Sequence, residues 1–272
     1  MPAPHIGPHA AEARQVAAGP ASIAVRIAGQ GPLVVCLPGL GRDASDLDPF
    51  AALLVEDGFR VALPQPRGMP GSSGPLENIT LHDLAADVAA VIEALGGGPA
   101  LLVGHAFGNR VARTLAADRG ALVRLVVLLG SSGAVQPAPE IAEAIRLAQA
   151  PGTEPGLRRQ AVQMAWFAPG ANIEPWMSGW SQPVMKAFLA AAAATPLDDF
   201  WTAGSAPLLI VQGLADFSAP PENGRMLAHQ VGDRAMLIEM PGIGHALPVE
   251  DAPRVAAMVL PVLHRFAEGD AA

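Results

Sequence analysis

The chain has 272 residues and a formal net charge of −8, with 17 Lys and Arg against 25 Asp and Glu. No basic face is evident in this acidic chain, which argues against binding of nucleic acid. The single cysteine, Cys36, excludes an internal disulfide and a cysteine-based zinc site, and its apolar neighbours predict a buried thiol.

No segment reaches the ~20 apolar residues that a membrane-spanning helix requires. The longest wholly apolar run covers only residues 187–194. The first 20 residues lack a basic segment followed by an apolar run, so they do not resemble a signal peptide. We expect a cytoplasmic protein with no membrane partner.

Short apolar runs alternate with segments of helical periodicity along most of the chain. The runs predict strands at residues 23–27, 33–37, 60–63, 100–103, 125–129, 208–211 and 236–239. The periodic segments predict helices at residues 43–57, 81–95, 107–118 and 251–266, the last kinked or split at Pro261. Continuously apolar strands that alternate with helices are typical of a parallel sheet covered on both faces. We therefore predict an α/β fold whose site lies at the carboxyl ends of the strands.

The alternation of predicted strands and helices stops between residues 136 and 205. No strand is predicted in this segment, and it contains all four tryptophans. We predict an N-terminal arm at 1–20, a core formed by 21–135 and 206–272, and a helical lid at 136–205. Ligand pockets are lined mostly by apolar and aromatic side chains. The predicted substrate-binding residues are Trp166, Trp176, Met177, Trp180 and Phe217.

The most informative motif is Gly104-His105-Ala106-Phe107-Gly108, which lies between a predicted strand and a predicted helix. It has the form of the G-x-S-x-G nucleophile elbow, with alanine where the serine stands. Four other loops also follow predicted strands: 37–41, 64–72, 212–216 and 242–245. In the sequence and chain order of these five loops, the chain resembles the α/β-hydrolase superfamily over nearly its whole length.

The resemblance implies a role for each loop. His245 would be the general base, Asp216 would orient it, and Ala106 occupies the position of the nucleophile. The backbone amides of Leu40 and Phe107 would form the oxyanion hole. No phosphate-binding loop is found, so we expect no cofactor, no nucleotide and no metal.

Three hypotheses account for Ala106. In the first, a serine has been replaced in a carboxylic ester hydrolase that cleaves an ester or lactone, leaving an inactive form; an original aspartate would instead suggest an epoxide hydrolase or dehalogenase. In the second, the alanine is natural, and His245 and Asp216 form a base dyad for water activation, proton abstraction or carbon–carbon cleavage. In the third, the chain is a non-catalytic ligand-binding homologue.

The composition of the lid favours a small hydrophobic or aromatic substrate. Arg42, just after the first of these loops, could meet an acidic group at the pocket mouth or lie on the surface at a helix start. Ser131 and Ser132 could line the pocket or form a simple turn. The sequence leaves open whether the protein is a monomer or a homodimer.

Overall fold

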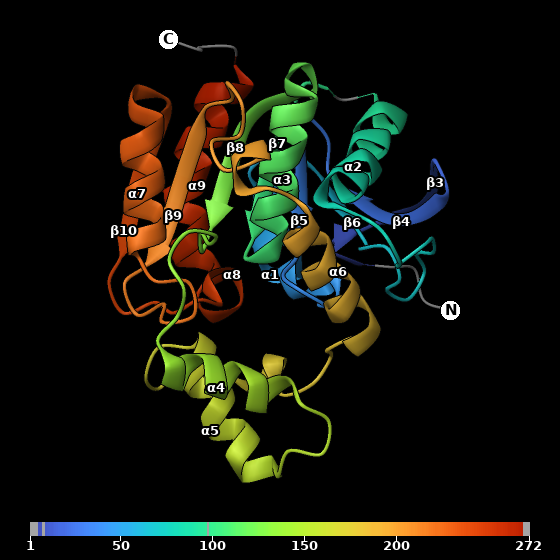
Figure 1. Ribbon diagram of the computed structural model, residues 1–272. Helices are drawn as coiled ribbons and strands as arrows, with labels where there is room; N and C mark the ends of the chain where they lie inside the picture. The colour runs from blue at the N-terminus through green and yellow to red at the C-terminus, as the bar shows by residue number, and fades with distance from the viewer. Residues whose placement is uncertain (1–4, 7–8, 97, 269–272) are drawn as a thin grey trace.

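The computed structural model describes residues 5–6, 9–96 and 98–268. An eight-stranded sheet lies at its centre, in the order β10-β9-β8-β7-β5-β6-β4-β3 (Figure 1). Its strands are β3 (Glu12–Ala18), β4 (Ala21–Ala28), β5 (Leu33–Leu37), β6 (Arg60–Pro64), β7 (Ala100–His105), β8 (Val123–Leu129), β9 (Leu208–Gly213) and β10 (Ala235–Met240). The strands from β6 to β10 along this order pair in parallel, and β4 pairs antiparallel with β3 and β6. A separate antiparallel pair joins β1 (His5–Ile6) and β2 (His9–Ala10).

Helices cover both faces of the sheet, as the buried strands require. One face packs against α2 (Leu81–Leu95), α3 (Phe107–Asp118) and α7 (Glu222–Val231). The other packs against α1 (Asp48–Glu56), α8 (Leu247–Glu250) and α9 (Ala252–Ala267). The described residues also contain five short 3-10 helices: η1 (Ala44–Leu47), η2 (Gly120–Leu122), η3 (Glu174–Trp176), η4 (Leu197–Asp199) and η5 (Gly232–Arg234). The predicted parallel, doubly covered sheet is confirmed.

Local sequence explains the helix that was predicted from periodicity between residues 81 and 95. Its apolar positions face the sheet, and Thr80 and Asp83 form a capping box at its start. Helix α9 runs without a break through Pro261, so the predicted split does not occur there. No helix within the described part of the chain is long and apolar enough to cross a membrane.

The N-terminal arm predicted at residues 1–20 is corrected in part. Residues 12–18 form β3, which pairs with β4 over seven registered positions and forms one edge of the sheet. Most side chains of β3 are exposed, so the segment lacks the apolar run that predicts a strand. Its order comes instead from backbone pairing with the next strand, β4, across a tight hairpin. Residues 1–4 and 7–8 lie outside the described residues.

A helical insertion, residues 136–205, connects β8 to β9. It contains α4 (Pro139–Gln149), α5 (Pro155–Trp166) and α6 (Gln182–Ala194). In Figure 1, α4 and α5 stand apart from the sheet, beyond the ends of the strands. Helix α6 contacts α2, and its Phe188 stacks on Phe107 at the start of α3. The insertion has a small core of its own, built around Trp166, Phe167 and Trp176.

The start of α3 packs very closely against the end of β5. A Cβ atom at Gly108 would lie 2.4 Å from the carbonyl oxygen of Leu37 and 2.7 Å from that of Pro38. A Cβ atom at Gly104 would lie 2.5 Å from the Cα of Asn109. Both approaches are to backbone, which cannot move aside cheaply, so only glycine fits at these positions.

We expect Gly108→Ala to lower the free energy of unfolding by about 2–4 kcal/mol, because the added methyl group overpacks a rigid junction. Chemical denaturation followed by circular dichroism measures this change. Gly120→Ala is the matched control, since nothing lies within 4 Å of a Cβ at that position; it should change stability by less than about 1 kcal/mol. Equal effects of the two substitutions would contradict the close-packing account.

Candidate active site

Ala106 occupies a strained turn between β7 and α3. Its backbone dihedrals are φ 52° and ψ −112°, a region that non-glycine residues rarely adopt and that costs about 1–3 kcal/mol. Its amide donates to the carbonyl of Leu129 at 3.0 Å, and its carbonyl accepts from the amide of Asn109 at 3.2 Å. Its side chain lines a cavity. The turn keeps the shape of a nucleophile elbow although the residue has no reactive atom.

His245 and Asp216 form a hydrogen-bonded pair on two neighbouring loops. The Nδ1 of His245 lies 2.8 Å from a carboxylate oxygen of Asp216. Asp216 is fully buried, and it also accepts from the amide of Ala219 at 2.7 Å and from the side-chain amide of Gln212 at 3.2 Å. The Nε2 of His245 has no hydrogen-bond partner among the described residues, and the imidazole lines the same cavity as Ala106. The pair is therefore arranged as a base with its orienting carboxylate.

The histidine loop is held against the helical insertion. The amides of His245 and Ala246 both donate to the carbonyl of Trp166, at 2.7 and 3.0 Å. The carboxylate of Glu250 accepts from the amides of Gly244 and Ala168, at 3.0 and 3.1 Å. Burial raises the pKa of Glu250 even though these two amides favour its charged form. The insertion thus fixes where the imidazole stands.

The cavity beside Ala106 has a volume of about 220 Å³. Leu40, Phe107 and His245 line it, and so do the predicted substrate-binding residues Trp166, Trp176 and Trp180. Their rings pack together, with Trp166 stacked on Trp180 at a centroid distance of 4.8 Å.

Two predicted residues lie elsewhere. Met177 packs against the core of the insertion and does not line this cavity. Phe217 is 52% exposed and lies in a separate groove with Met164 and Leu214.

The two amides predicted for the oxyanion hole lie beside Ala106. Leu40 and Phe107 both border the cavity. The Leu40 amide forms no hydrogen bond with the residues described. The Phe107 amide is the first of α3, where backbone amides have no acceptor within the helix. Neither amide has an acceptor among the described residues.

Arg42 is not on the surface, and it is one of the residues that line the cavity beside Ala106. It is only 3% exposed, and it donates to the carboxylate of Asp46 at 2.7 and 2.9 Å. It also donates to the carbonyls of Pro175 and Ser178 in the insertion. Its guanidinium lies 4.5 Å from the centre of the Trp180 ring. Arg42 therefore links the loop at 37–41 to the insertion, a role that depends on partners more than 130 residues away in the chain.

Ser131 and Ser132 take different positions. Ser132 lines the cavity, whereas Ser131 is fully buried and its hydroxyl has no hydrogen-bond partner. The amide of Ser131 donates to the side chain of Gln212 at 3.0 Å, so Gln212 joins this turn to the Asp216 loop. Gln212 was not predicted as part of the site, because its role is visible only once the two loops are side by side.

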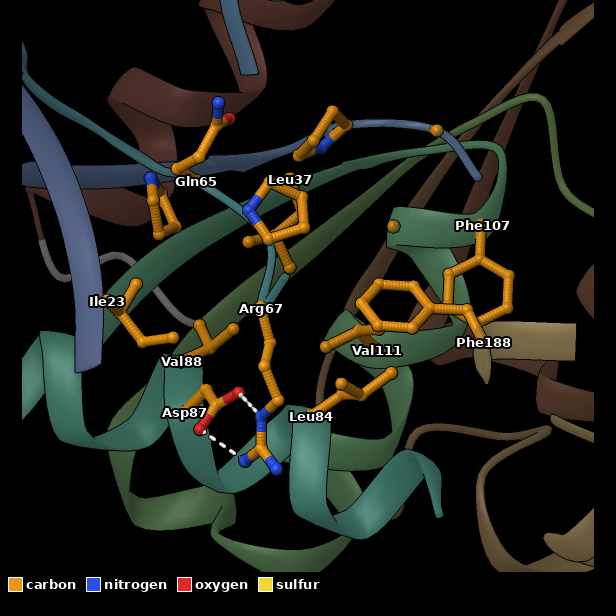
Figure 2. Close-up of a pocket in the computed structure, with 15 residues that line it drawn as sticks. Ile23, Leu37, Gln65, Arg67, Leu84, Asp87, Val88, Phe107, Val111 and Phe188 are labelled. Carbon is orange, nitrogen blue, oxygen red and sulfur yellow. Dashed lines mark hydrogen bonds and ion pairs between the residues drawn. The ribbon is translucent and has the colours of Figure 1, made fainter. Parts of the chain in front are cut away.

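A second, smaller cavity of about 50 Å³ lies on the other side of the loop at 37–41. Figure 2 shows its apolar lining and, at its base, the ion pair of Arg67 and Asp87. The guanidinium donates to both carboxylate oxygens, at 2.9 and 2.7 Å. Burial raises the pKa of Asp87 in spite of this partner. The pair fastens the loop at 64–72 to α2, and Gly39 and Phe107 border both cavities.

His105 is a buried support for the loop that carries His245. Its Nε2 donates to the carbonyl of His245 at 2.9 Å, while its Nδ1 has no partner. Burial, together with the nearby His245, lowers the pKa of His105 to about 3. The ring is therefore neutral at pH 7 and carries its proton on Nε2. No cluster of three or more His, Cys, Asp or Glu able to hold a metal is found in the described part of the chain.

Comparisons with known proteins place this geometry in a family. The model of the alpha/beta hydrolase family matches residues 34–258. The chain is 34% identical over 116 residues to 2-(acetamidomethylene)succinate hydrolase of Mesorhizobium japonicum, covering 43% of this chain and 41% of that protein. It is 32% identical over 117 residues to pyrrolizixenacetamide deacetylase of Xenorhabdus hominickii, covering 43% and 44%. The matched segments thus span less than half the length of these two curated relatives.

Solved structures extend the likeness to the whole chain. A thermophilic esterase from Thermogutta terrifontis superposes with a TM-score of 0.76 at 24% identity, covering 94% of this chain and 99% of that one. At this identity the likeness bears on the fold alone. The predicted α/β-hydrolase fold is confirmed, and the family match indicates a hydrolase.

The depressed pKa of His105 predicts a pH-dependent stability. Between pH 6.5 and about 3, the unfolded chain binds a proton at His105 that the folded chain does not. The free energy of unfolding therefore falls by about 1.4 kcal/mol per pH unit from this group as the pH is lowered. Denaturation between pH 6 and 4.5 should show a shallower slope for His105→Gln than for the unchanged chain. His229→Gln, at an exposed position, should keep the original slope. Identical slopes for the unchanged chain and both variants would contradict a lowered pKa of His105.

Proposed function

Because the chain belongs to the alpha/beta hydrolase family, we propose that its site is built to hydrolyse an ester or lactone bond of a small hydrophobic or aromatic substrate. The observation that carries the proposal is the elbow itself. Ala106 holds a strained φ of 52° in a cavity that it shares with His245, while the imidazole has a free Nε2. Strain of this kind gives an alanine no chemical advantage, but it is the conformation that presents a nucleophilic side chain.

With a serine at position 106, the residues present support acyl transfer in two halves. The hydroxyl oxygen attacks the ester carbon while Nε2 of His245 takes its proton, and Asp216 stabilises the resulting imidazolium. The amides of Leu40 and Phe107 donate to the oxyanion. The imidazolium then protonates the departing alcohol, leaving an acyl-enzyme. Water attacks this acyl group with the same base, releases the acid and restores the hydroxyl.

The present chain, with Ala106, cannot form the acyl-enzyme. It retains the base, the oxyanion donors and the aromatic cavity, so it binds the ester without turning it over by this route. We therefore interpret Ala106 as the silenced form of a Ser-His-Asp site, in which residues 136–205 act as a lid over the cavity.

The substrate class follows from the cavity. Three tryptophans and Phe107 supply an apolar, aromatic lining, and about 220 Å³ accommodates only a modest ligand. The names of similar proteins include an esterase, a deacetylase and the hydrolase of a substituted succinate, so they agree with hydrolysis of acyl bonds.

A second candidate function rests on the pair of His245 and Asp216. It is complete without a serine, and a base with a free Nε2 beside two amide donors can activate water or remove a proton from a bound substrate. This dyad would make the chain as it stands an enzyme.

We expect Ala106→Ser to hydrolyse p-nitrophenyl butyrate at least ~10³-fold faster, in kcat/KM, than the unchanged chain, because loss of the serine from the subtilisin triad costs ~10⁶ in turnover. Release of p-nitrophenolate measures the rate. His245→Ala in the Ala106→Ser background should abolish the gain.

Ala219→Ser is the matched control, since it adds a hydroxyl to the same cavity away from the elbow. It should produce no gain. Turnover by the unchanged chain at ordinary enzyme rates of ~1–10³ s⁻¹, lost in His245→Ala, would instead support the dyad and overturn the proposal.

A further inference from the structure

Arg110 is a cation on the wall of the cavity beside Ala106. It lies on the first turn of α3, four residues after Ala106, and both residues line the cavity together with His245. Helical side chains lean toward the N-terminus of their helix, which here means toward the elbow. Four residues correspond to a rise of only about 6 Å along the helix. The side chain of Arg110 is therefore near the position of a bound substrate.

The guanidinium of Arg110 has no partner among the described residues. No hydrogen bond or ion pair of its side chain is formed within this part of the chain, although a guanidinium carries five donors. Burial lowers the pKa of Arg110 without a compensating carboxylate. Arg42 and Arg67, which are more deeply buried than Arg110, are satisfied by Asp46 and Asp87. Arg110 is itself only partly exposed, and a guanidinium that is partly removed from water is more stable with an anionic partner.

The neighbouring Arg113 adds a second positive charge without a carboxylate. It is fully buried, and its hydrogen bonds go to neutral oxygens of Asn109, Ser132 and Trp201. Burial, together with the nearby Arg110, lowers the pKa of Arg113 to about 9. The two arginines make this side of the cavity positive in a chain whose net charge is −8.

The cavity itself supplies no negative charge to balance them. None of its lining residues is Asp or Glu. The nearest catalytic carboxylate, Asp216, is fully buried and engaged by His245, Ala219 and Gln212. An anionic group of a ligand in this cavity would therefore supply the partner that Arg110 lacks among the described residues.

We propose that Arg110 binds a carboxylate of the substrate, so that the natural substrate is an anionic ester such as a half-ester of a short dicarboxylic acid. This inference rests on the proposed function. The planar fork of a guanidinium matches a carboxylate with two parallel hydrogen bonds. A phosphate would ordinarily also require backbone amides, but the two amides available here, those of Leu40 and Phe107, serve the oxyanion. The aromatic wall would hold the alcohol part of the ester on the opposite side.

Binding to the unchanged chain, which does not form an acyl-enzyme, tests the inference. The probes are benzyl hydrogen succinate and benzyl 4-methylpentanoate, whose isopropyl group copies the shape of the carboxylate without its charge. We expect the anionic ester to bind about 10- to 100-fold more tightly in calorimetric titrations, the gain of a charge-assisted hydrogen bond. Arg110→Met should remove this preference, and Arg110→Lys should restore part of it.

The matched control is Arg265→Met, which removes the same charge from an exposed position on α9 and should keep the preference. Thermal unfolding of each variant confirms that it is folded. Equal affinity for the two esters, or a preference that survives Arg110→Met, would overturn the role of Arg110 while leaving the proposed function intact if Ala106→Ser hydrolyses neutral esters. Failure of both esters to bind, together with an inactive Ala106→Ser, would overturn the proposed function and this inference with it.

Discussion

The close contact between the start of α3 and the end of β5 is the constraint on which the site depends. Gly108 lies against the carbonyls of Leu37 and Pro38, so the first turn of α3 and the loop at 37–41 have one fixed relative position. With this contact in place, Leu40 and Phe107 line the same cavity as Ala106, and the chain turns sharply at Ala106 with a positive φ. The strain at Ala106 is the consequence, and it is offset by the packing of the surrounding sheet.

A second junction sets the other half of the site. A Cβ atom at Gly213 would lie 2.4 Å from the carbonyl of Gly244, so the loops that carry Asp216 and His245 are in backbone contact. Glu250 and the carbonyl of Trp166 then fasten the histidine loop to the insertion. Arg42 does the same for the loop at 37–41. The insertion is therefore a structural part of the site.

Much of this arrangement could be predicted from the sequence, since apolar strands, helical periodicity and glycine loops are local signals. The strand β3 escaped prediction because its exposed side chains carry no apolar pattern, and its order comes from pairing with β4. The role of Arg42 escaped because its carbonyl partners are distant in the chain. Phe217 lies outside the cavity of Ala106. The sequence could not predict this, because it depends on the direction in which an exposed loop side chain points. Arg110 has no side-chain partner within the described ranges, and this depends on which side chains surround it in space, so no local sequence pattern predicts it.

The central claim is that the turn at Ala106 still presents its side chain as a nucleophile to a base and an oxyanion hole. Covalent labelling of Ala106→Ser with a fluorophosphonate, followed by intact-mass measurement, tests this claim most directly. The serine oxygen would form a bond to phosphorus, fluoride would leave, and the proton would pass to His245. The account predicts one added phosphonyl group at position 106, lost in the His245→Ala background and absent from the unchanged chain. A folded Ala106→Ser variant that remains unlabelled would contradict it.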